Sequence, residues 1–357
     1  MTGYQEQISL PPRNPLRRFA PRPPWKGGQW GGGRGEAQSD DRRLTVDRVR
    51  HKPPSVVRRL RSIPPAPFLA GLLLLAACMT NTSETDFHDG LEAWRTQRYA
   101  DLQKPDGYLS LAGLYWLEDG EHTFGSDSSN SVVLPVNAPL HIGTLVVLDS
   151  VVTMLVRPGI KVTVDGEAVS ERVMLDDSEG SPTIAHLDSL NWRVISRSRG
   201  LAIRLLDRES PTRRAFDGIE FFEPDQRWRL EARFEPYDPP LEIAMPSITG
   251  VDEKDTVPGV VVFEVEGTEY RLDVTGQPGD DRYFVVFGDA TSGQETYGGG
   301  RFVWIDAEDD EGNIIIDFNR AYNPPCVFSP FATCPLPTPN NRLPIRIEAG
   351  ELNFEGH

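Results

Sequence analysis

Residues 259–276, GVVVFEVEGTEYRLDVTG, contain two runs rich in β-branched and aromatic residues on either side of Gly267. Both runs contain alternating apolar and polar residues close to the glycine, the period-two pattern of a strand with one buried face. Glycine adopts the positive φ angles that the shortest turns between antiparallel strands require. We therefore predict two antiparallel strands that meet at a tight turn around Gly267.

Four more β-rich runs follow this pair along the chain. The run NIIIDFN is preceded by DDEGN, residues 309–313, which predicts a hairpin, and strand alternation places Asp317 and Asn319 on one face of it. Runs that follow one another with short turns form an antiparallel meander, so residues 241–357 are predicted to form a half-open β-barrel. The four runs are RYFVVFGD (282–289), RFVWIDA (301–307), NIIIDFN (313–319) and LPIRIEAG (343–350).

The part of the chain before this meander contains more short β-runs. Residues 121–208 hold seven of them, separated by Gly, Asp and Asn, which predicts a β-sandwich. Helical spacing of Phe87, Leu91 and Trp94 predicts one helix over about residues 84–103. Residues 209–240 are rich in Pro, Arg and aromatic residues and are predicted to be a packed connection. The fold class is therefore mainly β, with one N-terminal helix.

Residues 58–78, RRLRSIPPAPFLAGLLLLAAC, have the layout of a secretory signal. Three arginines precede a ten-residue apolar run, which is half the length of about twenty residues that a spanning helix needs. Its end, Leu75-Ala76-Ala77-Cys78, resembles a lipobox, which implies cleavage before Cys78 and acylation of its thiol. We predict a signal peptide over 58–77 and a lipid-anchored tether and helix over 78–120. The alternative is an apolar patch that precedes a buried cysteine.

The expected location follows from this signal. Met79, rather than an aspartate, follows Cys78, which by resemblance to enterobacterial sorting favours the outer membrane of the cell envelope. Residues 1–57 are rich in Arg, Pro and Gly and are predicted to be a disordered leader. A start codon assigned too far upstream explains this leader, and a basic nucleic-acid-binding arm is the alternative.

The charge of the chain excludes one class of partner. The chain has 53 Asp and Glu against 37 Lys and Arg, and residues 1–77 hold 14 of these basic but only 5 of these acidic residues. The field of the remaining acidic chain repels phosphate backbones. We therefore expect no nucleic-acid partner, and a lipid bilayer partner only through the acyl chains on Cys78.

Two further cysteines lie in the proline-rich segment 317–337, DFNRAYNPPCVFSPFATCPLP. An even pair in an exported chain predicts a disulfide between Cys326 and Cys334. A zinc site needs additional thiolate or imidazole ligands, and a catalytic thiol needs a histidine base, and neither is found close to this pair in sequence. We therefore expect no metal and no cofactor.

A set of polar residues is predicted to gather at the mouth of the barrel. Its arginines could bind a small carboxylate or a sugar, and an Asp289/Asp317 pair could serve as acid and base. The alternative is an internal hydrogen-bond network that ties the proline-rich segment to the strands. The predicted binding residues are Tyr297, Arg301, Asp317, Asn319, Tyr322, Asn323, Asn341 and Arg342, with Asp289 and Thr291 beside them.

Three stretches carry a family resemblance. The segments GYLSLAGLYWLEDGEHTFGSDSSNSVVLP, FGDATSGQETYGGGRF and DFNRAYNPPCVFSPFATCPLPTPNNRLPIRIEAGE resemble the domain-of-unknown-function family number 1684 over about residues 90–352. That resemblance implies a secreted protein or lipoprotein and no particular reaction. Residues 121–208 also resemble a forkhead-associated sandwich. Its phosphothreonine-reading residues do not carry over, because Ser126 stands where the family has arginine.

No nucleophile elbow, zincin helix, phosphate-binding loop or dinucleotide fingerprint is present in the sequence. The sequence therefore favours a non-enzymatic envelope lipoprotein with a binding or assembly role. The alternative is a hydrolase, or a binder of small carboxylates or sugars, that uses the polar set. No catalytic residue is assigned, and the small-molecule or protein partner stays open.

Overall fold

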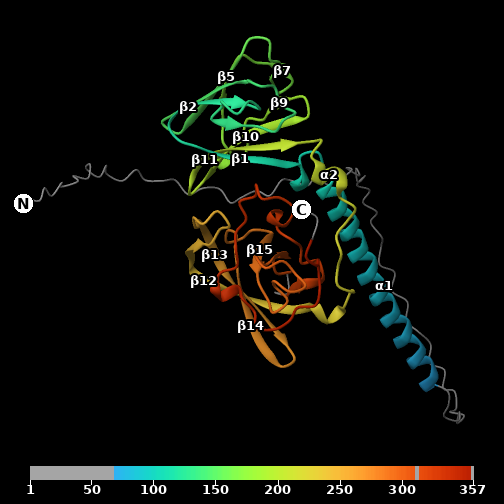
Figure 1. The fold of residues 1–357 in the computed structure, drawn as a ribbon. Helices are drawn as coiled ribbons and strands as arrows, with labels where there is room; N and C mark the ends of the chain where they lie inside the picture. Colours follow the sequence, from blue (N-terminus) through green and yellow to red (C-terminus); the bar gives the residue numbers. More distant parts are fainter. Residues whose placement is uncertain (1–67, 310–312, 355–357) are drawn as a thin grey trace, which may run out of the picture. The chain divides into compact units, whose positions relative to one another are not determined.

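The computed structural model describes residues 68–309 and 313–354, with side chains from Glu84 onward (Figure 1). The predicted leader and the first part of the predicted signal peptide lie outside these residues. The described chain divides into two compact units. One contains Leu111–Arg208, and the other contains the residues up to Ser110 together with those from Glu209 onward.

The first unit is a sandwich of two sheets, as the sequence predicts. The six-stranded sheet has the order β1-β11-β10-β9-β6-β7, and the five-stranded sheet has the order β3-β2-β4-β5-β8. Their bounds are β1 Leu111–Leu117, β2 Gly120–Gly125, β3 Val132–Val133, β4 Gly143–Leu148, β5 Val151–Val156, β6 Thr163–Val164, β7 Glu167–Ala168, β8 Glu171–Met174, β9 Ala185–Leu187, β10 Leu190–Arg197 and β11 Gly200–Asp207.

Both sheets contribute to one core in this unit. Phe124 of β2 and Trp192 of β10 meet edge to face with ring centroids 5.8 Å apart, and Met154 of β5 is fully buried. The β6–β7 turn uses positive φ at both Asp165 (53°) and Gly166 (82°), the conformation that matches the twist of the strands. The unit begins earlier than predicted, because the segment from Leu111 forms β1.

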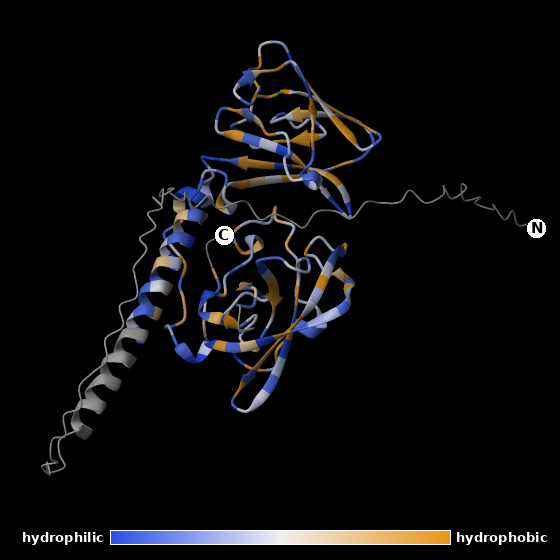
Figure 2. Ribbon diagram, turned by 180° about the vertical axis from the view of Figure 1, so that it is seen from behind, coloured by the Kyte–Doolittle hydropathy of each residue, from blue (hydrophilic) through white to orange (hydrophobic). Residues whose placement is uncertain are grey.

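The second unit begins with helix α1, Phe68–Leu102, which confirms the predicted helix. The helix continues on its N-terminal side through the apolar part of the predicted signal and through Cys78, whose side chain is not described. Figure 2 shows mostly hydrophilic residues, with some apolar ones between them, along the part of α1 whose side chains are described. Leu91 and Leu102 of this helix are buried. In residues 68–309 and 313–354, no helix has an apolar stretch long enough to cross a membrane.

A short helix, α2 (Pro211–Ala215), and two antiparallel sheets follow in the second unit (Figure 1). The predicted tight turn is present, because β13 and β14 pair up to Val265 and Thr268 with positive φ at Glu266 and Gly267. The sheet orders are β14-β13-β12-β17 and β15-β16. Their bounds are β12 Arg229–Met245, β13 Glu253–Val265, β14 Thr268–Val274, β15 Arg282–Phe287, β16 Arg301–Asp306 and β17 Ile314–Asp317.

The core of this unit surrounds Phe318, which is fully buried. Its ring meets those of Trp228, Phe263 and Phe287 at centroid distances of 6.4, 5.5 and 5.2 Å, each pair edge to face. Such aromatic pairs add about 0.5–1.5 kcal/mol beyond the burial of their area. Ile316, on the same side of β17 as the ring of Phe318, is also fully buried, as the predicted alternation requires.

The structure differs from the predicted meander in four places. Strand β12 begins at Arg229, inside the predicted connection, because an irregularity in its pairing between Pro236 and Leu241 accommodates the prolines. Strand β17 pairs with β12 rather than with β16, so the predicted hairpin is wrong as a strand pair. The predicted strand at 343–350 is wrong, since no ladder forms there among the described residues. None of the described sheets closes into a barrel.

Candidate functional site

The loop between β15 and β16, GDATSGQETYGGG (288–300), is organised by the carboxylate of Asp289. Asp289 accepts hydrogen bonds from the hydroxyl of Thr291 at 2.9 Å and from the backbone N–H of Ile347 at 2.7 Å. The hydroxyls of Thr291 and Thr296 lie 2.9 Å apart, and Gly293 N–H donates to the Thr296 carbonyl at 2.8 Å. These contacts close the loop on itself.

Arg301, the first residue of β16, lies underneath this loop and is fully buried. Its Nη2 donates to Asp289 Oδ1 at 3.3 Å and to the Ile347 carbonyl at 3.0 Å, and its Nη1 donates to the Ala349 carbonyl. The guanidinium lies over the ring of Phe287, 5.3 Å from its centroid. Burial lowers the pKa of Arg301, although the Asp289 carboxylate opposes this shift.

Asn341 joins two strands through its side-chain amide. The Nδ2 group donates to the carbonyls of Asp273 in β14 and Val286 in β15, at 2.8 and 2.9 Å. The Oδ1 atom accepts from Asp273 N–H at 2.9 Å. The amide thus bonds to backbone groups through both its nitrogen and its oxygen, which is how a buried amide is stabilised.

Asn319 has a similar structural role in a 3₁₀ turn, Phe318–Arg320, that follows β17. Its side chain accepts from Asp225 N–H at 3.0 Å and donates to the Asp225 carbonyl at 2.9 Å. The carboxylate of Asp317 caps the turn by accepting from Asn319 N–H at 3.1 Å. Asp317 and Asn319 are therefore in contact. Their side chains form hydrogen bonds with each other and with the backbone rather than facing an open cavity.

A second buried ion pair joins α1 to the end of the described chain. Arg98 Nε donates to Glu351 Oε1 at 2.8 Å, and Glu351 Oε2 accepts from Asn323 N–H at 2.7 Å. Arg98 also lies 4.7 Å from the ring centroid of Tyr322. Burial acts to lower the pKa of Arg98, but the Glu351 carboxylate outweighs it and the pKa is raised. Burial raises the pKa of the Tyr322 hydroxyl.

Arg98 and Glu351 are residues that the sequence did not single out. They are 253 positions apart, and each resembles the many other charged residues of this chain. The one available signal was the helical spacing of Arg98, which lies seven positions after Leu91 and four positions before Leu102.

Cys326 and Cys334 are both buried in the second unit and lie next to each other. Cys326 N–H donates to Cys334 Sγ at 3.1 Å, and the hydrogen bond with Cys334 lowers the pKa of the Cys326 thiol. Burial raises the pKa of the Tyr297 hydroxyl, and its hydrogen bond with Cys326 adds to this effect. The two sulfur-bearing residues thus meet in space, and the disulfide between them stays a prediction.

The predicted polar set is therefore brought into one unit, but most of it faces inward. Arg301, Asn319, Asn323 and Asn341 are buried, whereas Arg342 is exposed. In the part of the chain that the structure describes, Asp289 and Asp317 bind different partners. That part also holds no cluster of three or more His, Cys, Asp or Glu placed to bind a metal ion.

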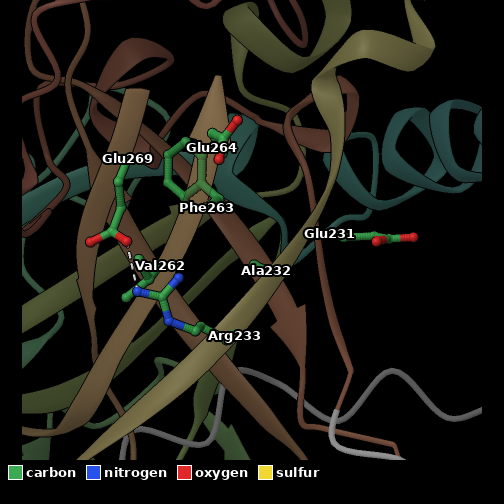
Figure 3. Close-up of a pocket in the computed structure, with 7 residues that line it drawn as sticks. All are labelled: Glu231, Ala232, Arg233, Val262, Phe263, Glu264 and Glu269. Atoms are coloured by element: carbon green, nitrogen blue, oxygen red, sulfur yellow. Dashed lines mark hydrogen bonds and ion pairs between the residues drawn. The ribbon is translucent and has the colours of Figure 1, made fainter. Parts of the chain in front are cut away.

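The described surface of the second unit includes a hollow over the sheet and another at the 288–300 loop. The smaller, with a volume of about 210 Å³, lies over β12, β13 and β14 and is drawn in Figure 3. Arg233 and Glu269 face each other there and form an ion pair at 2.7 Å, while Glu231 lies apart from them. Arg233 also pairs with Glu235 at 3.0 Å, so the cation of this hollow already has acidic partners within the protein.

The larger hollow, of about 400 Å³, is lined by the tip of the 288–300 loop and by the end of the described chain. Tyr297 is the one residue of the predicted binding set that lines it. Its other lining side chains are Gln294, Thr296, Val327, Asn353 and Phe354, and two glycines complete it. We refer to this hollow as the Tyr297 pocket.

Comparisons with known proteins give a family but no activity. No curated protein matches the chain. The solution NMR structure of an uncharacterized protein of Haloarcula marismortui is 32% identical, with a TM-score of 0.35, and the match covers 41% of this chain and 83% of that one. A family model matches residues 214–352, a shorter range than the resemblance from about residue 90 predicts. Through these residues, the chain belongs to the family described as a protein of unknown function (DUF1684).

Proposed function

We propose that this protein is a lipid-anchored protein of the bacterial cell envelope, and that its second unit is a rigid binding or assembly module without catalytic activity. The absence of catalytic activity is supported by one observation, which is that the polar set makes its hydrogen bonds within the protein. Arg301 donates hydrogen bonds to Asp289 and to the carbonyls of Ile347 and Ala349. The Asn341 amide bonds to backbone groups of Asp273 and Val286. Side chains held in this way stabilise loops and have little capacity left for a substrate.

A hydrolase is the alternative, and the geometry gives it less support. General acid and base groups must reach the substrate at about hydrogen-bond distance. Arg301 is fully buried, and Asp289 is enclosed by Thr291 and Ile347, so neither faces solvent in a position to meet a substrate.

The lipobox-like sequence at Leu75–Cys78 supports the anchor. Because helix α1 is continuous through Cys78, it sets the distance between the anchor and the packed part of the helix. Leu91 is the first buried residue of α1 among its described side chains. Leu91 lies thirteen positions after Cys78, a distance of about 20 Å along a helix. An anchored protein would therefore hold its second unit close to the bilayer, and we place it at the outer membrane.

We expect the anchor to depend on the Cys78 thiol. Cells that express the full chain and receive labelled palmitate should incorporate the label into the wild-type protein, and Cys78→Ala should abolish incorporation. The variant should also leave the detergent-rich phase in a phase-partition assay. Cys326→Ser is the matched control and should retain the label, because that cysteine is buried within the second unit. A wild-type protein that carries no label contradicts the proposal.

Export also predicts the disulfide between Cys326 and Cys334. Each thiol loses a proton and the pair loses two electrons, which pass to the exchangeable disulfide of an oxidising protein. By the chain-entropy estimate this crosslink contributes about 2–3 kcal/mol, less where prolines already restrict the unfolded loop. Non-reducing mass spectrometry of protein taken from the envelope should find one linked peptide pair, two hydrogens lighter than the free thiols. Free thiols in that sample would remove the crosslink.

A further inference from the structure

The Tyr297 pocket has a rigid frame. Its loop is fixed from below by Asp289, which bonds to Thr291 and to the buried Arg301. The end of the described chain is fixed beside the loop, because Asn353 N–H donates to the Glu295 carbonyl at 2.9 Å. The buried ion pair between Asp289 and Arg301 thus stabilises the loop that shapes the pocket.

The pocket has an aromatic and apolar side. The ring of Phe354 lies 5.8 Å from that of Phe216 and 5.1 Å from that of Phe328, so it rests on a buried aromatic cluster. Tyr297 packs against the same cluster and is half-buried, and Val327 lies almost fully buried beside it. A ligand would meet a flat apolar surface there that is already in position.

The other side of the pocket carries amides. Gln294 and Asn353 are exposed, and in the described part of the chain neither side-chain amide has a hydrogen-bond partner. Each amide offers two donors and one acceptor oxygen. This differs from Asn319, Asn323 and Asn341, whose amides bond to the backbone of the protein.

The pocket is also uncharged. None of its described lining residues is acidic or basic, in a chain with a net charge of −16. The nearest charge on the loop, Glu295, is paired with Arg346 at 2.6 Å. A carboxylate or phosphate ligand would find no arginine or lysine partner here, whereas a ligand rich in hydroxyls could bond to the amides.

From these features we propose that the Tyr297 pocket binds a neutral saccharide. One face of a sugar ring is apolar and would pack against Tyr297 and Phe354, while its hydroxyls would bond to Gln294 and Asn353. The volume of about 400 Å³ falls within the usual range for small-molecule sites, about 300–1,000 Å³. This ligand class rests on the proposed binding role in the envelope, where saccharides are accessible to an anchored protein.

Saturation-transfer NMR on the full chain in detergent tests this proposal. The probes are glucose, galactose, mannose, N-acetylglucosamine and their common disaccharides, with succinate as an anionic comparison. At least one saccharide should give a saturable signal. Replacing Gln294 and Asn353 together by alanine should weaken binding about thirtyfold, because two hydrogen bonds of about 1 kcal/mol each are lost. Both side chains are exposed, so the variant should keep its fold, as a melting curve will check.

The matched control is Gln226→Ala, an exposed glutamine outside the pocket, which should leave saccharide binding unchanged. Absence of any saccharide signal, equal binding by the double variant, or binding of succinate alone would each overturn the proposal. Palmitate incorporation is measured independently. A labelled protein that binds no saccharide would therefore refute the ligand while leaving the anchor intact.

Discussion

Replacing Arg301 by methionine is expected to lower the free energy of unfolding of the second unit by about 3–5 kcal/mol, which is the cost of breaking a buried ion pair from one side. The substitution leaves the carboxylate of Asp289 buried without its cation. It also leaves the carbonyls of Ile347 and Ala349 without their donor. Methionine retains much of the volume of the side chain, so the loss reports the charge and hydrogen bonds rather than a large cavity.

Urea unfolding of the full chain, followed by hydrogen exchange with mass spectrometry, measures this loss and assigns it to one unit. Exchange should increase in the 288–300 loop and around Ile347, and should stay unchanged in the β-sandwich of the first unit. Arg233→Met is the control, because its ion pairs with Glu235 and Glu269 are about half exposed. It should change stability by less than about 1 kcal/mol. Equal effects of the two substitutions would contradict the structural role of Arg301.

Replacing Glu351 by glutamine is expected to have a similar cost, about 3–5 kcal/mol. The substitution keeps the shape of the side chain but removes the charge that faces Arg98, which is 10% exposed on its side chain. It also puts an amide where two donors, Arg98 Nη2 and Asn323 N–H, now meet Oε2. The packed part of α1 should therefore loosen before the sheets do.

Hydrogen exchange over residues 87–102 measures this loosening, and protection there should fall more than in β13 or β14. Glu348→Gln is a closely matched control, only three positions away. Its ion pair with Arg346 is 2.9 Å long and about half exposed, so its loss should be worth less than about 1 kcal/mol. Unchanged protection of α1 in Glu351→Gln would show that this ion pair does not hold the helix.

Local patterns predicted the elements whose period is clear. The hairpin around Gly267 and the alternation of Ile316 with Asp317 follow from one buried face, and the structure shows both. Strand β12 was missed because three prolines interrupt its pattern, although an irregular pairing between Pro236 and Leu241 tolerates them. Apolar and polar residues alternate in residues 343–350 as they do in a strand. Backbone groups of this segment, however, form hydrogen bonds with the side chains of Asp289 and Arg301 instead of with a neighbouring strand.

At the candidate site, residue types predict that a polar cluster is present but not which way its side chains face. Arginines, amides and tyrosines near glycine-rich loops predict a polar cluster, and the cluster is present. Whether such groups face a cavity or one another depends on contacts between distant segments, such as Arg301 with Ile347 or Arg98 with Glu351. Of the predicted binding residues, Tyr297 lines the Tyr297 pocket, together with Gln294 and Asn353, which were not among the predicted site residues.

A double-mutant cycle on Asp289 and Arg301 tests most directly whether the polar cluster is an internal scaffold. Free energies of unfolding would be measured for Asp289→Asn, for Arg301→Met and for the double variant. If the two side chains stabilise the loop as one unit, the double variant should lose about 2 kcal/mol less than the sum of the single losses. Small and additive losses would mean that the pair contributes little to the fold, and they would contradict this account.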